Sequence, residues 1–365
     1  MKKSVDKPFL ISVIILAVAG FFIFTSASLG LLAKNEARFT AIALNQLFLG
    51  LCLGGVAMFV TSRIPYTNWK KWSLVLFAAS IVLTLLVFIP GLGMRHGGAL
   101  RWLQIGSFSF QPSEALKIGY IMYLAAFLSK HKNKIDTPML GVVPFCLISL
   151  IVAVILALQP DNDTLLMTLF AGATMFFVAG ARWRDILTLA LVGIIGLTAI
   201  FFAHPYVRER ITTFFNPGEN ALTSSYQIQQ SLIAIGSGGF LGKGFGQSTQ
   251  KFNFLPEPIG DSIFAVASEE FGFVGSVLIV ALFLFFGFRG LKIALKAPDE
   301  FGRLLTLGIV ILIMAGSFIN ISAMLGLIPL SGTPLLFISH GGSALFITLA
   351  VTGIVLNVSK GRQSK

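Results

Sequence analysis

Long apolar runs separated by short polar connections dominate the hydropathy pattern of this chain. Several runs contain no Asp, Glu, Lys or Arg and exceed the roughly 20 residues with which a helix crosses the ~30 Å hydrocarbon layer of a membrane. The longest, residues 304–359, contains a proline-rich break at 329–334, which divides it into two helices. The runs lie at 9–33, 39–62, 73–94, 117–129, 137–160, 164–181, 186–204, 271–288 and on either side of 329–334. The pattern predicts an all-α integral membrane protein with about ten transmembrane helices, formed by residues 1–365 as a single polytopic domain.

The composition excludes the soluble classes of protein. Of the 365 residues, 55% are hydrophobic and 12% are charged, whereas ordinary globular domains carry about 25% charged residues. A water-soluble enzyme, a nucleic-acid-binding protein or a disordered regulator cannot bury this much apolar side chain. Cys52 and Cys146 both lie inside apolar runs, so we expect neither a disulfide framework nor a cysteine-based metal site.

Basic residues are distributed unevenly between alternate connections. With the N-terminus in the cytoplasm, the cytoplasmic connections hold most of the 27 Lys and Arg residues, as the positive-inside rule requires. Both termini are therefore predicted to be cytoplasmic. The net charge of +12 then reflects membrane topology, and we expect no nucleic-acid partner.

Two extracytoplasmic connections are much longer than the rest, at about 90–112 and, between helices 7 and 8, at about 204–261. Long loops in a compact protein are usually functional. The unusual polar residues of the chain lie in these connections and at the adjoining helix ends. We therefore expect the active site on the extracytoplasmic side.

The first long connection and the helix after it contain Arg101, Glu114 and Lys117. Pro112 suits the first turn of a helix, which places Glu114 and Lys117 at i and i+3 on one face. An unpaired ammonium at the threshold of a membrane span is costly. The two residues form either a structural ion pair or, with Arg101, a cavity for an anionic lipid headgroup. Arg101 and Trp102 also suit an interfacial anchor.

A short polar turn places Asp161 and Asp163 directly before another predicted span. In one interpretation Asp163 caps this helix, because a negative charge is favoured at a helix N-terminus. The pair would alternatively hold a divalent cation, for which two carboxylates from one turn are a weak signal.

The second long connection contributes Arg210, Lys243 and a glycine-rich stretch at 236–246. Its spacing does not match the phosphate-binding pattern Gly-x-x-x-x-Gly-Lys-[Ser/Thr], so we expect no nucleotide site. The glycines either let backbone N–H groups approach a lipid pyrophosphate or form a plain flexible loop.

Asp261 stands where this connection becomes a membrane helix. It is either the N-cap of that helix or a general base, because a carboxylate at the rim of an apolar cavity is more basic than one in water. Glu269 and Glu270 follow two turns deeper. Acids embedded in a membrane are candidates for function, and one of these two would otherwise pair with Lys117 or Arg101.

Six motifs, in order along the apolar runs, resemble the SEDS family (shape, elongation, division and sporulation), whose members are FtsW, RodA and SpoVE. They are Gly98-Ala99-x-Arg101-Trp102, Gln111-Pro112-Ser113-Glu114-x-x-Lys117, Gln159-Pro160-Asp161, Tyr226-Gln227-x-x-Gln230-Ser231 continuing to Gly239, Leu255-Pro256-Glu257 with Asp261, and Ile338-Ser339-x-Gly341-Gly342-Ser343. No single motif suffices, but six in order are a specific match. The segments around 226–232 and 244–251 look closer to FtsW or SpoVE than to RodA.

This resemblance implies a peptidoglycan glycosyltransferase that polymerises lipid II at the outer face of the cytoplasmic membrane, with a role in cell division. It implies that Asp261 is the catalytic residue. The substrate-binding residues that we expect on the same basis are Arg101, Glu114, Lys117, Arg210, Lys243, Glu257 and Ser339. No protein metal ligands are expected. The chemistry allows for one cofactor, a divalent cation (Mg²⁺ or Mn²⁺) beside the pyrophosphate.

The partners implied by the resemblance are lipid II, a class B penicillin-binding protein and other proteins of the divisome or elongasome. Two other functions stay open. Membrane-embedded acids and Lys117 would suit a flippase, a transporter of the lipid-linked precursor, and a scaffold would position the transpeptidase without catalysis. The extracytoplasmic position of the acid clusters in the loops favours the polymerase over the flippase.

Overall fold

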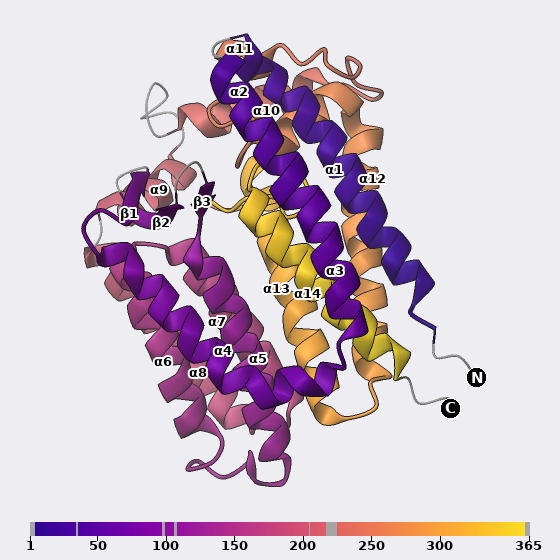
Figure 1. The fold of residues 1–365 in the computed structure, drawn as a ribbon. Helices are drawn as coiled ribbons and strands as arrows, with labels where there is room; N and C mark the ends of the chain where they lie inside the picture. Colours follow the sequence, from indigo (N-terminus) through magenta and orange to yellow (C-terminus); the bar gives the residue numbers. More distant parts are fainter. Residues whose placement is uncertain are drawn as a thin grey trace.

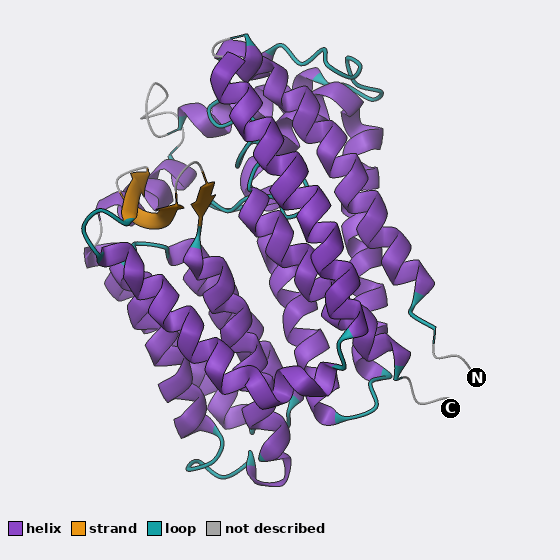
Figure 2. Cartoon of the chain, in the orientation of Figure 1, coloured by secondary structure: helices purple, strands orange, loops and turns teal. Residues whose placement is uncertain are grey.

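The computed structural model describes residues 4–33, 36–96, 99–105, 108–203, 205–216 and 225–361. Helices form most of it, and one small sheet lies at one end (Figure 2). The elements are α1 (Lys7–Leu32), α2 (Glu36–Leu44), the π-helix η1 (Asn45–Leu53), α3 (Gly54–Arg63), α4 (Tyr66–Leu85), the 3-10 helix η2 (Leu86–Phe88), β1 (Gly93–His96), β2 (Ala99–Ile105), β3 (Phe108–Phe110), α5 (Pro112–Lys130), the 3-10 helix η3 (Lys132–Lys134), α6 (Val142–Leu158), α7 (Asn162–Val178), α8 (Trp183–Ala203), α9 (Pro205–Phe215), α10 (Tyr226–Ser237), α11 (Gln250–Asn253), α12 (Ile263–Leu295), α13 (Glu300–Met324) and α14 (Gly342–Lys360).

The long helices form two groups that lie side by side (Figure 1). One group contains α4 to α8, and the other contains α1 to α3 with α12 and α14. Helix α13 packs against α12 in the second group and against α5 and α7 in the first. The chain therefore uses α13 to join its two halves.

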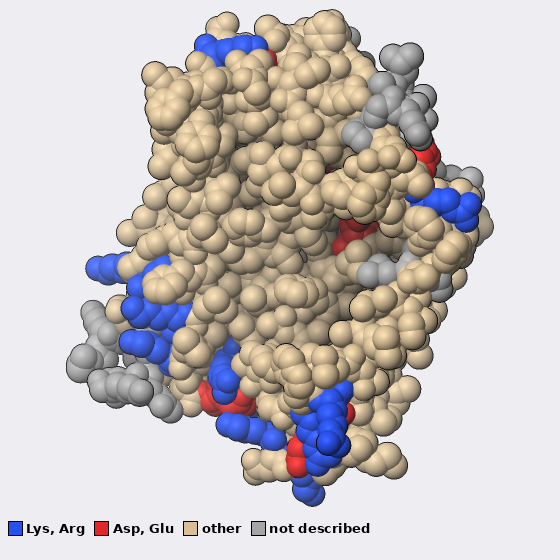
Figure 3. Space-filling model, turned by 180° about the vertical axis from the view of Figure 1, so that it is seen from behind, with Lys and Arg blue, Asp and Glu red and all other residues tan. Residues whose placement is uncertain are grey.

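The molecule has the surface of a membrane protein. Within the described residues, six helices are long and apolar enough to cross a membrane, and α6 and α7 are shorter apolar helices. Large apolar side chains such as Phe22, Leu147 and Ile194 are more than half exposed, which marks a lipid-facing surface. Figure 3 shows a broad uncharged belt, with most of the visible Lys and Arg gathered toward one end. The prediction of an all-helical membrane protein is confirmed.

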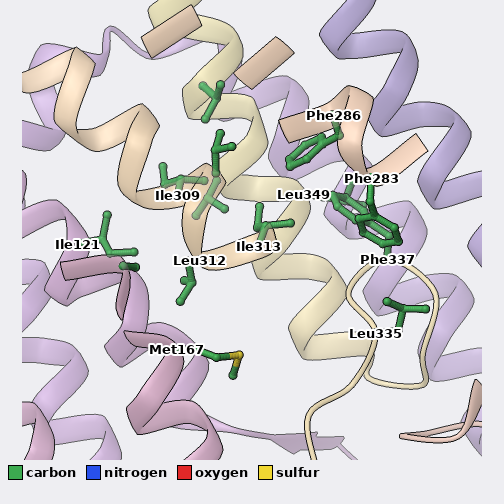
Figure 4. Close-up of a cluster of buried hydrophobic side chains, with 14 of the residues drawn as sticks. Ile121, Met167, Phe283, Phe286, Ile309, Leu312, Ile313, Leu335, Phe337 and Leu349 are labelled. Carbon is green, nitrogen blue, oxygen red and sulfur yellow. The ribbon is translucent and has the colours of Figure 1, made fainter. Parts of the chain in front are cut away.

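The buried core follows α13 through the molecule (Figure 4). Ile309 and Ile313 of α13 are almost completely buried, as are Ile121 of α5 and Phe286 of α12. Small residues allow the close approach of helices. A Cβ at Gly308, for example, would lie 2.7 Å from Ile121 Cγ2. This packing gives the polar groups on α13 fixed positions relative to both halves.

Both long connections contain structure that the hydropathy pattern did not predict. Residues of the first form the antiparallel sheet β1-β2-β3, in which Leu103 pairs with Gly93 on one side and Phe110 on the other. The second contains the helices α9, α10 and α11. The predicted break at 329–334 is confirmed, because α13 ends at Met324 and α14 begins at Gly342.

Helix α12 is longer than its predicted apolar run because the helical path continues across a kink at Gly272 (φ 65°, ψ −163°). The N–H groups of Phe273 and Val274 donate to the carbonyls of Gly239 and Phe240, at 2.9 and 3.2 Å. The loop after α10 thus satisfies backbone groups that the kink releases. Only glycine fits the kink without strain, since φ is positive there.

Candidate functional site

Asp261 lies in the turn between α11 and α12. The helix begins at Ile263 and its N-cap is Ser262, so the alternative that Asp261 caps the helix is wrong. Gln227 of α10 donates to Ser262 Oγ at 3.1 Å. Among the residues that the structure describes, none donates a hydrogen bond to the Asp261 carboxylate. The carboxylate is partly buried and is left available to a ligand.

Burial raises the pKa of Asp261 to about 7. Loss of water is the largest cause, and the nearby charge of Glu257 adds to it. Arg210 acts in the opposite direction, Asp163 raises the pKa further, and Arg101 lowers it. A carboxyl group with a pKa near the working pH has the protonation behaviour of an efficient general base.

Asp163, Arg210 and Asp261 surround Gly332, and we call this arrangement the Gly332 cluster. Asp163 Oδ2 accepts a hydrogen bond from Gly332 N (2.8 Å) and pairs with Arg210 Nη1 (3.3 Å). A Cβ at position 332 would lie 3.6 Å from Asp163 Oδ2, 3.7 Å from Arg210 Nη2 and 3.8 Å from Asp261 Oδ2. Charged groups from α7, α9 and the turn before α12 therefore meet at one point.

A pocket of about 270 Å³ adjoins the Gly332 cluster. Arg101, Asp163 and Arg210 form its charged part. Its apolar lining includes Leu165, Leu166, Val207, Ile211, Ile319, Ile328 and Leu330. Guanidinium groups bind phosphate oxygens in a bidentate manner, and the apolar wall offers contact to hydrocarbon. The pocket has the chemistry to hold an anion attached to a lipid.

Arg101 connects β2 to the turn between α6 and α7. Its Nε donates to Gln159 O at 3.1 Å, its Nη2 donates to Pro160 O, and Nη1 lies 4.0 Å from Asp161 Oδ1. Asp161 is buried, and this burial raises its pKa despite the opposing charge of Arg101. Arg101 thus shapes the turn and also borders the pocket.

Glu114 and Lys117 form the ion pair that their i, i+3 spacing predicts. Helix α5 begins at Pro112, and Lys117 Nζ lies 2.7 Å from Glu114 Oε1. Both side chains are buried. The pair does not border the pocket described above, although Lys117 is close enough to Asp161 to lower the pKa of that carboxyl group.

Lys243 lies in a second cluster, formed by the loop after α10, α11 and the first turns of α12. Its Nζ contacts Glu269 Oε1 at 2.6 Å, and Lys251 Nζ contacts Glu270 Oε1 at 2.7 Å. We call these four residues the loop–α12 cluster. The prediction that Glu269 or Glu270 pairs with Lys117 or Arg101 is wrong, because the loop supplies its own lysines.

Glu257 and Ser339 both act on the turn that carries Asp261. A Cβ at Gly260 would lie 3.6 Å from Glu257 Oε2, so the Glu257 side chain folds back over Gly260. Ser339 Oγ donates to Gly260 O at 2.8 Å and accepts from Leu335 N at 2.8 Å. Both predicted residues therefore lie beside Asp261 in the fold.

The described residues contain no group of three or more His, Cys, Asp or Glu side chains that could hold a metal ion. Asp163 and Asp261 bring two carboxylates to the Gly332 cluster. Mg²⁺ is commonly bound by one or two carboxylates together with substrate phosphates and water, so these residues fit a cation that shares its ligands with a substrate.

Two residues at the site escaped the sequence reasoning. Asn320 on α13 donates to Asp261 O and Thr333 O, at 2.8 and 2.7 Å. Gln46 in η1 donates to Ser339 O and accepts from Gly341 N, at 3.2 and 3.0 Å. The sequence did contain a signal, because each is an amide residue inside an apolar run. Both are buried in the structure, where polar groups need specific hydrogen-bond partners.

The family model of the FtsW, RodA and SpoVE cell cycle proteins matches residues 7–364 of this chain. Stage V sporulation protein E of Bacillus subtilis (strain 168) is 40% identical over 351 residues, which cover 96% of this chain and 95% of that protein. A protein of Geobacter sp. (strain M18) named probable peptidoglycan glycosyltransferase FtsW is 38% identical over 354 residues, which cover 97% and 96%.

Solved structures agree with these relatives. A chain from a peptidoglycan synthase complex, in a study of how polymerization and crosslinking are coordinated, has a TM-score of 0.80 with 27% identity and 99% coverage of both chains. The rod shape determining protein RodA of Thermus thermophilus has a TM-score of 0.70 with 27% identity, covering 99% of this chain and 98% of that one. The chain belongs to the FtsW/RodA/SpoVE family.

Proposed function

We propose that this chain is a peptidoglycan glycosyltransferase that polymerises lipid II into glycan strands during cell division. The observation that carries the proposal is the convergence of Asp261, Asp163 and Arg210 on Gly332, beside a pocket with a charged end and an apolar wall. A lipid-linked pyrophosphate has both of these chemical parts. The names of relatives in the same family supply the reaction class.

Asp261 is the proposed general base. Its carboxylate accepts the proton of the 4-hydroxyl of the acceptor sugar while that oxygen attacks the anomeric carbon of the lipid-linked donor. The bond from the anomeric carbon to the pyrophosphate oxygen breaks with inversion, and undecaprenyl pyrophosphate leaves. Two observations support this role. No described residue donates a hydrogen bond to the carboxylate, and its pKa is about 7.

Arg210 and Arg101 are the proposed binding groups for the pyrophosphate, since both line the pocket. Fixed positive groups stabilise the charge that develops on a leaving group. Glu257 and Ser339 hold the Asp261 turn. Within the proposal, Glu114 and Lys117 act on the site through Asp161, whose pKa Lys117 lowers, and Lys243 holds the loop–α12 cluster through Glu269.

The proposal includes a divalent cation, Mg²⁺ or Mn²⁺, only as an ion that the protein and the substrate would coordinate together. Asp163 and Asp261 are the residues that would hold it, and it would supply positive charge beside the pyrophosphate when bound.

The proposed topology has ten membrane-spanning helices in one domain, with both termini in the cytoplasm and the 204–261 connection outside. The active site then faces the extracytoplasmic side of the cytoplasmic membrane. The proposed partner is a class B penicillin-binding protein with other divisome or elongasome proteins. The likeness to a chain of a peptidoglycan synthase complex supports this partner.

The test is polymerisation of labelled lipid II by the purified protein, with and without its cognate transpeptidase. Wild type is expected to form long glycan strands, and a folded Asp261→Ala variant is expected to form none. If neither forms strands even with the transpeptidase present, the polymerase proposal fails. Transfer of lipid II across liposome membranes by the same protein would then identify a flippase, and assembly with the transpeptidase without transfer would identify a scaffold.

A further inference from the structure

Three consecutive carbonyl groups before α12 are bound by the C-terminal part of the chain. Ile259 O accepts from His340 N at 2.7 Å, and Gly260 O accepts from Ser339 Oγ at 2.8 Å. Asp261 O accepts from Asn320 Nδ2 at 2.8 Å. The first two donors belong to the segment before α14, whereas the third lies on α13, the helix between the two halves of the molecule.

Asn320 is completely buried and uses both hydrogens of its amide nitrogen. One is donated to Asp261 O at 2.8 Å and the other to Thr333 O at 2.7 Å. Both partners are carbonyl oxygens, which only accept hydrogen bonds. The orientation of the amide is therefore fixed, since the opposite orientation would direct Oδ1 at two other oxygens.

The acceptor of the same side chain is left unused. Asn320 Oδ1 is buried and has no hydrogen-bond partner among the residues that the structure describes. A buried acceptor without a partner opposes stability. A contribution to stability is therefore a weaker explanation for an asparagine at position 320. The better explanation is that its amide holds two carbonyl groups at a set distance from each other.

Those two carbonyls belong to the two sides of the Gly332 cluster. Asp261 carries the proposed base, and Thr333 follows Gly332, whose N–H donates to Asp163 Oδ2 at 2.8 Å. The turn is stiffened locally, because Ser331 Oγ lies 2.5 Å from Thr333 Oγ1. One amide on a packed helix thus sets the distance between the segment of Asp261 and the segment that orients Asp163.

We propose that Asn320 is a positioning residue, which holds the Asp261 turn and the Gly332 turn in the spacing that the glycosyl transfer requires. The inference rests on the proposed function of Asp261 as the base. Both hydrogen bonds of Asn320 go to backbone oxygens and the side chain is fully buried, so it acts through Asp261 and Asp163 and not on the substrate.

Asn320→Ala tests this inference through the kinetics and pH dependence of lipid II polymerisation. We expect kcat to fall about 10- to 100-fold with KM within about twofold, because a small displacement of a reacting group has a large effect on rate while Arg101 and Arg210 still bind. We also expect the acidic limb of the kcat/KM profile to move to lower pH, since a loosened Asp261 turn lets water reach the carboxylate.

Asn357→Ala is the matched control. Asn357 also makes two hydrogen bonds to the backbone of another segment, donating to Ser62 O at 2.8 Å and accepting from Tyr66 N at 2.9 Å. It lies near the C-terminal end of α14, whereas the segment with Gly332 precedes the N-terminal end of that helix. We expect this variant to lower the thermal unfolding midpoint in detergent, with kcat and the acidic limb unchanged for the folded protein.

Asn320→Gln decides the matter if Asn320→Ala does not fold. It keeps both donors but displaces them by one methylene, and we expect a folded protein with lowered kcat and a displaced acidic limb. Wild-type kcat and pH profile in a folded Asn320 variant would overturn the inference, and so would a loss that merely follows the fraction of unfolded protein. If instead Asp261→Asn retains wild-type polymerisation, the proposed role of Asp261 as the base fails while the polymerase activity stands, and absence of polymerisation by wild type is what refutes the proposed function.

Discussion

The Gly332 cluster and the loop–α12 cluster contain similar charged groups in very different surroundings. In the loop–α12 cluster, Glu269 accepts from Lys243, Ser248 and backbone N–H groups, with the contact to Ser248 Oγ at 2.5 Å. Glu270 contacts Lys251 at 2.7 Å and Ser26 at 2.6 Å. In the Gly332 cluster, Asp163 Oδ2 accepts from Gly332 N at 2.8 Å and pairs with Arg210 Nη1 at 3.3 Å.

The difference separates charges that build the fold from charges that are available to a ligand. Glu269 and Glu270 are buried with their lone pairs occupied, and together with the kink at Gly272 they fix the loop on α12. The Asp261 carboxylate accepts no hydrogen bond from the residues that the structure describes. Protein partners satisfy Glu269 and Glu270, whereas in the Gly332 cluster the Asp261 carboxylate is left for a ligand.

The largest expected effect comes from neutralising one carboxylate in each cluster and comparing the two variants. Asp261→Asn removes the proposed base, so polymerisation is expected to fall by about 10²- to 10⁴-fold with little change in thermal stability. Glu269→Gln is the matched change in the loop–α12 cluster, and it is expected to lower stability while the folded fraction stays active. Initial rates and thermal unfolding midpoints of both variants test this. If Glu269→Gln lost activity without losing stability, the loop–α12 cluster would not be purely structural, and the distinction between the two clusters would fail.

Lys251→Met is expected to be the most destabilising change in the loop–α12 cluster. It leaves Glu270 buried without its cation, and breaking a buried pair in this way costs about 3–5 kcal/mol. Lys243→Met is a milder comparison, because Lys243 is 33% exposed whereas Lys251 is fully buried. Unfolding in detergent at increasing denaturant concentration measures both. Equal losses of unfolding free energy in the two variants would show that burial does not decide how much an ion pair contributes to stability.

The pH dependence of the reaction sharpens the assignment of Asp261. A base must be deprotonated to act, so kcat/KM of wild type is expected to rise with pH through the pKa of about 7. Glu257 raises this pKa, and Glu257→Gln is therefore expected to move the acidic limb to lower pH. Arg210 lowers it, so Arg210→Gln is expected to move the limb to higher pH. Movement of the two limbs in the same direction would contradict the electrostatic explanation.

Sequence reasoning predicted the helical membrane fold because hydropathy is a local property of the chain. The break at 329–334 was predicted from the length of the uncharged run and its proline-rich segment, and the start of α5 from Pro112; both are found. The sheet of β1 to β3 and the kink at Gly272 were not predicted. Strand pairing there and the hydrogen bonds from Phe273 and Val274 to the loop join residues that no local pattern connects.

The candidate site was predicted less completely for the same reason. Asp261 and Arg210 were identified as residues of interest from their types and places, and they do meet at Gly332. Sequence reasoning could not show that Lys243 is held by Glu269 or that Asn320 joins two segments of the site. Such pairings depend on how α13 and the loops pack, which a single sequence does not reveal.

The smallest expected effect comes from Lys132→Ala, which tests whether contact distance alone decides the energy of an ion pair. Lys132 Nζ lies 2.8 Å from Glu300 Oε2, almost the same distance as in the Lys251–Glu270 pair, but the Lys132 side chain is 55% exposed. Water and salt screen an exposed pair, so we expect a change below about 1 kcal/mol that shrinks further at high salt. Thermal unfolding at low and high salt measures it. A loss as large as that of Lys251→Met would mean that proximity, and not desolvation, makes the loop–α12 cluster structural.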